Sequence, residues 1–201
     1  MRTLVLNAHP DIANSKINSL WHKAFAKEKG VTQRLLSEVV VGPNYQFDID
    51  REQSFLLGHD RIILQFPWYW YSAPAIMKAY IDQVLSYGFA YGPDGDKLAG
   101  KEALILTSTG GPEVSYHAGG YNNFSMDEFL KPFQQTFLLA KAVYLSPYVF
   151  HGGVTATESE LEASVEAMLA HVLDRELNPQ VKLDRLLKEL QVYNEGPSEV
   201  A

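Results

Sequence analysis

The sequence contains no cysteine. This absence excludes disulfide bonds, a thiol nucleophile, and any zinc or iron–sulfur site that depends on cysteine ligands. The histidines do not follow a metal-ligand spacing either, so we expect no metal site. Redox chemistry in such a chain would have to come from a bound organic cofactor.

Positive charge and long hydrophobic runs are also scarce. The formal net charge is −7 and the pI is about 5.3, which argues against nucleic-acid binding and against a basic membrane-binding patch. No apolar run approaches the roughly 18 residues of a membrane span, and the first residues lack a signal-peptide pattern. We therefore expect a soluble, cytoplasmic protein.

Several familiar motifs are missing as well. The loop after the first predicted strand has neither G-x-G-x-x-G nor G-x-x-x-x-G-K-[ST], so it is neither a dinucleotide fingerprint nor a P-loop. No G-x-S-x-G elbow is present, and Ser108 precedes Thr-Gly-Gly instead. A Ser-His-Asp hydrolase is therefore a poor alternative.

What the sequence does contain is an alternation of apolar runs and helical periodicity, in 201 residues that suffice for one domain. We expect strands at residues 3–6, 33–41, 62–66, 103–107 and 143–150, the last with a bend at Pro147. We expect helices at residues 17–30, 50–57 and 74–87, and two more after the capping residues Ser125 and Thr157. The pattern predicts an α/β fold: a doubly wound, five-stranded parallel sheet in the order 2-1-3-4-5, with helices on both faces.

Four consecutive aromatic residues, Trp68 to Tyr71, follow the third predicted strand between Pro67 and Pro74. Adjacent side chains cannot all face one core, whether the local period is 2 or 3.6. In an open α/β sheet, ligands bind at the carboxyl ends of the strands. We therefore expect this stiff loop to contact a planar cofactor; the alternative is core packing together with a subunit interface.

Two further strand-end loops carry unusual residues. His9 and the helix start at residues 14–18 could bind a phosphate through free backbone N–H groups, although a plain helix cap is the commoner explanation of such a loop. Gly110 and Gly111, after Ser108 and Thr109, allow a ligand to approach the backbone closely. Strands 1, 3 and 4 are neighbours in the predicted order, so the three loops should meet at one crevice.

We expect residues 1–176 to form the domain and residues 177–201 to add a weaker amphipathic helix with a polar end. That helix either packs on the domain or contacts a second subunit. The sequence leaves both alternatives open.

The chain resembles the flavodoxin-like NAD(P)H:quinone oxidoreductases. It is most similar to the short bacterial branch that includes the ancillary subunits of glutathione-regulated potassium-efflux systems. The similarity covers roughly residues 1–175. Its matching pieces are Asn7-Ala8-His9-Pro10, Ser15-x-x-Asn18, Gln65-Phe66-Pro67-x-x-Trp70-Tyr71-Ser72-x-Pro74, Lys78, Ile81-Asp82, Gly88-Phe89-Ala90-Tyr91-Gly92, Gly100-Lys101 and Thr109-Gly110-Gly111.

The resemblance implies that residues 1–176 are a flavodoxin-like domain with a non-covalent flavin. The compact 42–58 segment favours FMN over FAD. The implied phosphate and ribityl ligands are His9, Ser15, Lys16, Ile17 and Asn18. The implied isoalloxazine contacts are Trp68, Tyr69, Trp70, Tyr71, Ser108, Thr109, Gly110 and Gly111.

The resemblance also implies a homodimer with the active site at its interface, where Tyr91 helps to line the partner's substrate pocket. Tyr116 and Tyr121 are the implied catalytic residues. Some relatives carry a histidine near residues 121–122 that this chain lacks. Either Tyr121 substitutes for it or the flavin works without a side-chain acid.

The implied function is hydride transfer from NAD(P)H through the flavin to a quinone or similar acceptor. We expect both substrates to use one place in turn, which gives ping-pong kinetics. The alternatives are a regulatory flavoprotein subunit of a potassium-efflux transporter, an azo- or nitro-reductase, and a flavodoxin-type electron carrier.

Overall fold

A computed structural model of the chain describes residues 1–195. Its main sheet has the neighbour order β2-β1-β5-β6-β7, β8 also pairs with β6, and all pairs are parallel. The strands are β1 (Thr3–Asn7), β2 (Val31–Leu35), β5 (Arg61–Pro67), β6 (Glu102–Ser108), β7 (Val143–Tyr144) and β8 (Tyr148–Phe150). The predicted doubly wound topology is confirmed. The fifth strand consists of β7 and β8, two short pieces on either side of Pro147.

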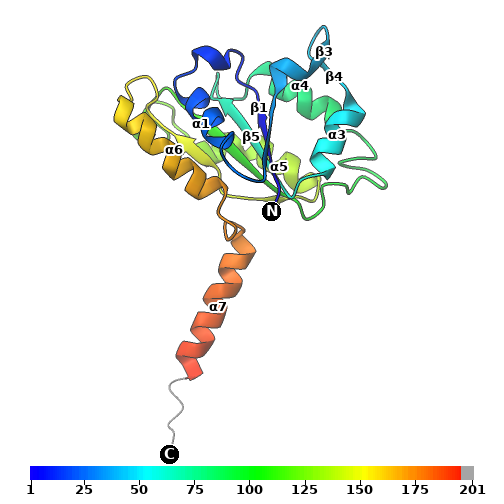
Figure 1. The fold of residues 1–201 in the computed structure, drawn as a ribbon. Helices are drawn as coiled ribbons and strands as arrows, with labels where there is room; N and C mark the ends of the chain where they lie inside the picture. Colours follow the sequence, from blue (N-terminus) through cyan, green and yellow to red (C-terminus); the bar gives the residue numbers. More distant parts are fainter. Residues whose placement is uncertain (196–201) are drawn as a thin grey trace, which may run out of the picture.

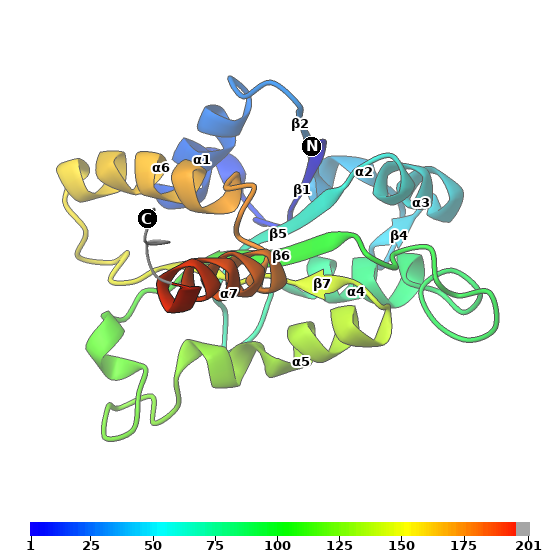
Figure 2. The ribbon, with the colours of Figure 1, turned by 90° about the horizontal axis from the view of Figure 1, so that it is seen from below.

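Helices cover both faces of the sheet (Figure 2). They are α1 (Ile17–Phe25), α3 (Ile49–Leu57), α4 (Ala75–Val84), α5 (Met126–Leu139) and α6 (Glu158–Val172). Successive strand residues point to opposite faces, so Leu4 and Leu6 pack with α4 and α5 while Val5 packs with α1 and α6. The expected capping boxes are present at Ser125 and Thr157.

Some predicted boundaries were wrong. The run at residues 33–41 is not one strand. β2 ends at Leu35, and a one-turn helix α2 (Leu36–Val39) and a small hairpin of β3 (Val40–Gly42) and β4 (Gln46–Phe47) follow. Leu36 is fully buried in the core. The helical turn brings its side chain there, whereas a continued strand would place it elsewhere.

Two predicted helix ends also move. α1 ends at Phe25 rather than near Gly30, and Gly30 instead adopts a left-handed φ of 81° just before β2. α4 ends at Val84 rather than near Tyr87. In both cases the helix ends at its last buried apolar residue, Phe25 or Val84, and the chain continues in non-helical turns.

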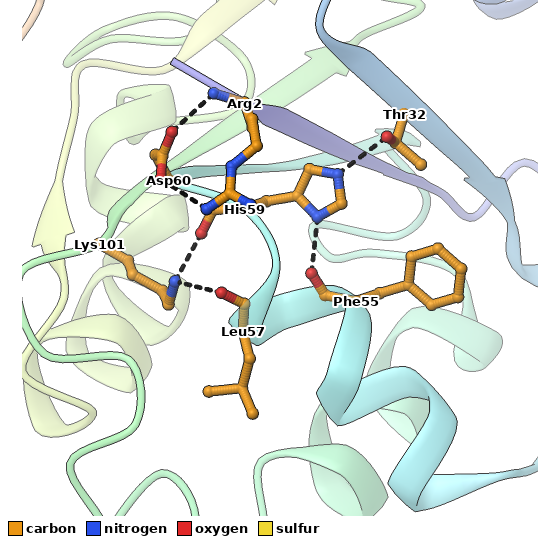
Figure 3. Close-up of polar contacts among 7 residues, drawn as sticks. All are labelled: Arg2, Thr32, Phe55, Leu57, His59, Asp60 and Lys101. Atoms are coloured by element: carbon orange, nitrogen blue, oxygen red, sulfur yellow. Dashed lines mark hydrogen bonds and ion pairs between the residues drawn. The ribbon is translucent and has the colours of Figure 1, made fainter.

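The amino ends of the strands are joined by polar contacts (Figure 3). The Lys101 ammonium donates to the carbonyl oxygens of Leu57 and His59 at 3.0 and 2.6 Å, where α3 ends. Arg2 pairs with Asp60 at this exposed edge. Nearby, the fully buried Arg61 pairs with Glu102 and donates through Nη1 to the carbonyl oxygen of Val172, at the last residue of α6, at 2.6 Å.

The last helix, α7 (Pro179–Glu195), extends away from the domain (Figure 1). Every side chain described on it is exposed. The predicted polar end, residues 196–201, lies outside the described residues. In the described part of the chain, no helix has the length and hydropathy needed to cross a membrane.

Candidate functional site

A cleft of about 360 Å³ opens at the carboxyl ends of β1, β5 and β6. Four loops contribute to it: the expected three and a fourth that follows β8. The lining residues are His9, Asp11, Asn14, Ser15, Lys16, Ile17, Asn18, Pro67, Trp68, Tyr69, Ser108, Thr109, Gly110, Gly153 and Val154. The predicted convergence of three strand-end loops is therefore present in the structure.

The start of α1 supplies hydrogen-bond donors to one end of the cleft. The Ser15 hydroxyl oxygen accepts from the backbone N–H of Asn18 at 3.0 Å, which fixes the first turn. The earlier N–H groups of a helix have no intrahelical partner, and the helix dipole makes this end positive. The exposed Lys16 adds a full positive charge beside them.

His9 lies on the same rim. Its Nδ1 accepts from the backbone N–H of Asp11 at 3.1 Å, so the neutral ring carries its proton on Nε2. Partial burial lowers the pKa of His9, against the opposing influence of the Asp11 carboxylate. The hydrogen bond from the Asn14 side chain lowers the pKa of Asp11, so that group is ionised at neutral pH.

A buried amide network ties the ends of β5 and β6 to the start of α1. Gln65 Nε2 donates to the backbone oxygen and to Oδ1 of Asn18, both at 3.2 Å. Asn18 Nδ2 in turn donates to Ser108 Oγ at 3.3 Å. All three side chains are buried. The Asn18 side chain therefore joins β5, β6 and α1 in the wall of the cleft.

The aromatic loop folds back on itself as a tight two-residue turn. Tyr69 and Ser72 exchange backbone hydrogen bonds of 2.9 and 3.0 Å, while Trp70 and Tyr71 between them adopt φ of 46° and 61°. Two successive left-handed residues at a hairpin turn are typical of type I′, which favours Asn or Gly rather than aromatic residues. Such residues cost of order 1 kcal/mol each and cluster at functional sites.

Three of the four rings of this loop have different surroundings. Trp68 is buried against Phe66 and Phe129, and its backbone N–H donates to the oxygen of Ser108 at 2.9 Å. Tyr71 stacks on Phe129 and donates its hydroxyl to Asn122 Oδ1 at 3.1 Å. The Trp70 side chain, by contrast, is 93% exposed.

The fourth loop, after β8, was missed by sequence reasoning. Its backbone is joined to the Ser108–Gly111 loop: Gly152 N–H donates to the oxygen of Gly111 at 2.8 Å, and Gly153 N–H to that of Thr109 at 2.9 Å. A Cβ on Gly153 would lie 2.5 Å from Ile17 Cδ1 and 3.2 Å from the backbone oxygen of Thr109, so the Ile17 side chain would have to shift to admit a larger residue. The Gly-Gly pair at 152–153 was the available signal, but its partner strand could not be known.

His151, in the same loop, also went unassigned. Its Nδ1 lies 3.1 Å from Thr109 Oγ1, and its ring centroid lies 5.3 Å from that of Tyr116. Burial lowers the pKa of His151 and raises the pKa of Tyr116. At neutral pH the structure thus holds an uncharged imidazole and a protonated phenol directly behind the Thr109 side of the cleft.

The cleft brings together most of the predicted cofactor ligands, namely His9, Ser15, Lys16, Ile17, Asn18, Trp68, Tyr69, Ser108, Thr109 and Gly110. The other predicted site residues, Trp70, Tyr71, Gly111, Tyr116, Tyr121 and Tyr91, do not line it. Trp70 and Tyr71 form the adjoining turn, and the Tyr121 hydroxyl lies 2.7 Å from where a Cβ on Gly111 would be. Tyr91 lines a different hollow of about 270 Å³ between α4 and α5.

The donor set fits a flavin nucleotide. Lys16, the N–H groups that begin α1 and the hydroxyl of Ser15 suit a phosphate and a polyol chain. The buried Nε1 of Trp68 has no hydrogen-bond partner within residues 1–195, as expected where a ligand atom completes the site. Gly110 and the aromatic turn leave backbone accessible to the edge of a flat ring.

Comparison with known proteins identifies the family. The profile described as "Flavodoxin-like fold" (Flavodoxin_2) matches residues 1–172. The chain belongs to this family.

Curated relatives extend the comparison. The chain is 44% identical over 191 residues to the NAD(P)H oxidoreductase YdeQ of Bacillus subtilis, covering 95% of this chain and 96% of the relative. It is 39% identical over 172 residues to General stress protein 14 of the same organism, covering 86% and 97%. It is 36% identical over 160 residues to the potassium-efflux ancillary protein KefG of Cronobacter sakazakii, covering 80% and 86%.

Solved structures share the fold closely. A general stress protein 14 from Treponema denticola in complex with FMN is 34% identical, with a TM-score of 0.79 over 85% of this chain and 97% of the other. An NADPH-quinone reductase from P. pentosaceus is 33% identical, with a TM-score of 0.77 over 86% and 98%. A protein described as a thermophilic tryptophan halogenase from Streptomycin violaceusniger is 41% identical, with a TM-score of 0.81 over 85% and 98%.

Proposed function

We propose that this protein is an FMN-dependent NAD(P)H oxidoreductase that reduces a quinone or a similar acceptor. The observation that carries the proposal is the cleft that is lined both by the positive start of α1 and by glycine and aromatic residues of the neighbouring loops. An FMN-bound relative and an NADPH-quinone reductase of the same fold support it. When bound, the flavin supplies the chemistry: it accepts a hydride from the nicotinamide and passes two electrons to the acceptor.

The protein binds and orients the two ends of the cofactor differently. The N–H groups of the first turn of α1, Lys16 and His9 hold the phosphate, while Thr109 and Gly110 meet the ring edge through hydroxyl and backbone groups. Preorganised donors of this kind stabilise negative charge on a reduced ring without moving. Asn18 keeps the three loops in register through Gln65 and Ser108.

The side of the cleft beyond Gly111 is the proposed place of the substrates. Tyr116 and Tyr121 come from the loop that crosses this side, and the raised pKa of Tyr116 keeps its phenol a donor at neutral pH. We assign both tyrosines to orienting the substrates and donating hydrogen bonds to them. Because NAD(P)H and the acceptor use one place, the kinetics should be ping-pong.

We also propose a homodimer in which the α4–α5 face contacts a second copy. Tyr87, Tyr91, Leu138 and Leu139 are all large apolar residues that this face leaves 44–66% exposed. Contiguous apolar exposure of this kind marks an interface. The Tyr91 loop of one copy would then complete the substrate pocket of the other.

The test begins with the purified protein and FMN. We expect a yellow protein that binds FMN and oxidises NAD(P)H with a quinone. The Lys16→Glu variant should weaken FMN binding roughly tenfold, because it places a negative charge beside the phosphate. Lys23→Glu is the matched control, since Lys23 is an exposed residue of the same helix that does not line the cleft. A protein that binds no flavin under any condition contradicts the proposal.

A second candidate is regulation of a potassium-efflux transporter, which the KefG relative favours. The two functions are compatible, because docking on a transporter need not block the cleft. A cytoplasmic location, which we also propose, suits both. If the candidate is right, co-expression with such a transporter will raise potassium efflux and the two proteins will co-purify; an unchanged efflux rate counts against it. Azo and nitro compounds are alternative acceptors for the same reaction.

A further inference from the structure

Helix α7 carries an apolar stripe that its own domain leaves exposed. The stripe consists of Leu183, Leu186, Leu187, Leu190 and Tyr193, whose side chains are exposed by 46%, 51%, 49%, 47% and 83%. The residues at 183, 186, 190 and 193 are spaced by three, four and three. This is the a/d spacing of a helix that packs along another helix.

A helix of this length needs a partner to be stable. An isolated helix of about 15 residues is marginal in water, and most helical stability comes from burying an apolar face. Every side chain described on α7 is exposed. An exposed apolar stripe of this kind marks a surface for interaction with another molecule.

The domain itself is not that partner. The family profile ends at residue 172, before α7 begins, and General stress protein 14 of Bacillus subtilis aligns with only 86% of this chain. The YdeQ alignment covers 95% of this chain and must reach into α7. The helix thus lies beyond the part of the chain that the family profile matches.

The base of α7 is firmly joined to the domain. Leu177, just before the helix, is buried in the core beneath α6. Arg61 donates to the oxygen of Val172 at the end of α6, and Arg185 on the first turns of α7 pairs with Glu176. From this base α7 presents the stripe away from the domain (Figure 1).

The charges on α7 select the kind of partner. Lys182, Arg185 and Lys188 are balanced by acidic residues that include Asp184 and Glu189, so the helix lacks the basic face that binds anionic lipid. Lys182 and Glu189 lie seven residues apart, about two turns, and thus on the same flank of the stripe. The flank is self-complementary in charge.

We propose that α7 pairs in antiparallel orientation with α7 of a second copy of this chain. In an antiparallel pair of helices the same flanks meet, so Lys182 of each copy approaches Glu189 of the other, twice by the two-fold symmetry. In a parallel pair, this flank would meet the flank that carries Leu187 instead, and the charges would go unused. In this register Leu183, Leu186 and Leu187 of the two copies form the core of the pair, and Leu190 packs beside the first turn of the other helix.

The α7 pairing is too small to hold two copies together alone, so it acts together with another interface. Five side chains on each helix bury much less than the roughly 800 Å² per partner of a standard interface. Two such pairs acting together gain strength from effective concentration. If the α4–α5 face forms dimers, α7 joins two of them into a tetramer. The proposal does not depend on cofactor binding or on catalysis.

The mass of the full-length protein in solution tests the pairing. We expect L186E/L190E to have half the mass of the wild type by size-exclusion chromatography with light scattering, at tens of micromolar protein. V181E is the matched control. Val181 is a 44% exposed residue of the same helix that lies nine residues, about two and a half turns, from Leu190 and so on the opposite side. V181E should keep the wild-type mass.

Circular dichroism and FMN binding show that the variants keep the domain intact. Equal masses for the wild type and L186E/L190E would overturn the proposal. So would binding of the wild type, but not of L186E/L190E, to neutral phosphatidylcholine vesicles with no difference in mass, because that result would assign the stripe to a lipid surface.

Charge exchange tests the orientation. K182E and E189K should each raise the dissociation constant of the assembly severalfold, because each places like charges opposite one another. The K182E/E189K double variant should restore the wild-type value. Wild-type behaviour of both single variants, or no recovery in the double variant, would overturn the antiparallel pairing.

Discussion

At the scale of single residues, the aromatic turn has the most strained backbone of the site. Trp70 and Tyr71 have left-handed φ values, which Asn and Gly adopt at a lower energetic cost. Tyr71 recovers part of the cost by stacking on Phe129 and bonding Asn122. Trp70 has no such compensation in its almost fully exposed side chain. An exposed aromatic side chain on a strained backbone fits a role toward the substrate or toward a second copy.

This strain gives a prediction for Trp70→Asn. The apoprotein should gain about 0.5–1 kcal/mol in free energy of unfolding, because Asn adopts the left-handed region more readily. Urea unfolding monitored by circular dichroism measures the change. The matched control is Val114→Asn, an exposed position without a positive φ, where we expect no gain. Equal effects at the two positions would show that the turn stores no strain.

His9 gives a prediction of pH dependence. Burial lowers the pKa of His9 in the apoprotein, and a bound phosphate should raise that pKa by favouring the imidazolium. The complex then takes up a proton, so FMN affinity should increase as the pH falls through the pKa of the complex and level off below that of the apoprotein. Calorimetric titration between pH 6.5 and 8 measures this. His9→Asn should remove that part of the slope, and an unchanged slope would rule His9 out as a phosphate ligand.

Residue types and their places at strand ends were enough to predict most of the cleft. Asn18 and Lys16 follow a first strand, Trp68 a third and Thr109 a fourth, and the fold rule brings these loops together. The neighbours of those residues were not predictable. His151 and Gly153 reach the site only because the short β8 ends beside Thr109, and no local pattern specifies that register.

At the scale of elements, strand alternation and helix caps predicted the sheet and the two layers of helices. The exception is the segment after β2. Its apolar residues from Leu35 to Val41 fit a strand, but the core takes up Leu36 by means of a single helical turn. A tertiary contact there outweighs local propensity, which is weak for so short a run.

Arg61 joins three elements, so we predict that its replacement causes a large loss of stability. Its guanidinium is completely buried between Glu102 on β6 and the end of α6. Arg61→Met leaves Glu102 and the oxygen of Val172 without that partner, and should lower the free energy of unfolding by about 3 kcal/mol. Arg2→Met is the control, because its ion pair with Asp60 is exposed (Figure 3) and worth at most about 1 kcal/mol. Chemical unfolding measures both, and similar losses would contradict the assignment.

At the scale of the whole molecule, the structure offers two separate apolar surfaces, the α4–α5 face and the stripe on α7. Leu139→Glu on the first should split the proposed homodimer and lower kcat/KM, because Tyr91 no longer reaches the other copy. Leu57→Glu, at a similarly exposed position outside that face, is its control. Light scattering and steady-state kinetics report the two effects, and a monomer with full activity would refute the shared pocket.

The break at Pro147 has a consequence for the behaviour of this protein at high concentration. A parallel sheet that ends in a long, regular strand exposes a row of unpaired backbone groups, on which the edge of another sheet can add. Here that border consists of two- and three-residue pieces, and the proline between them has no N–H to offer. The molecule thereby resists strand-to-strand aggregation along this border of its sheet.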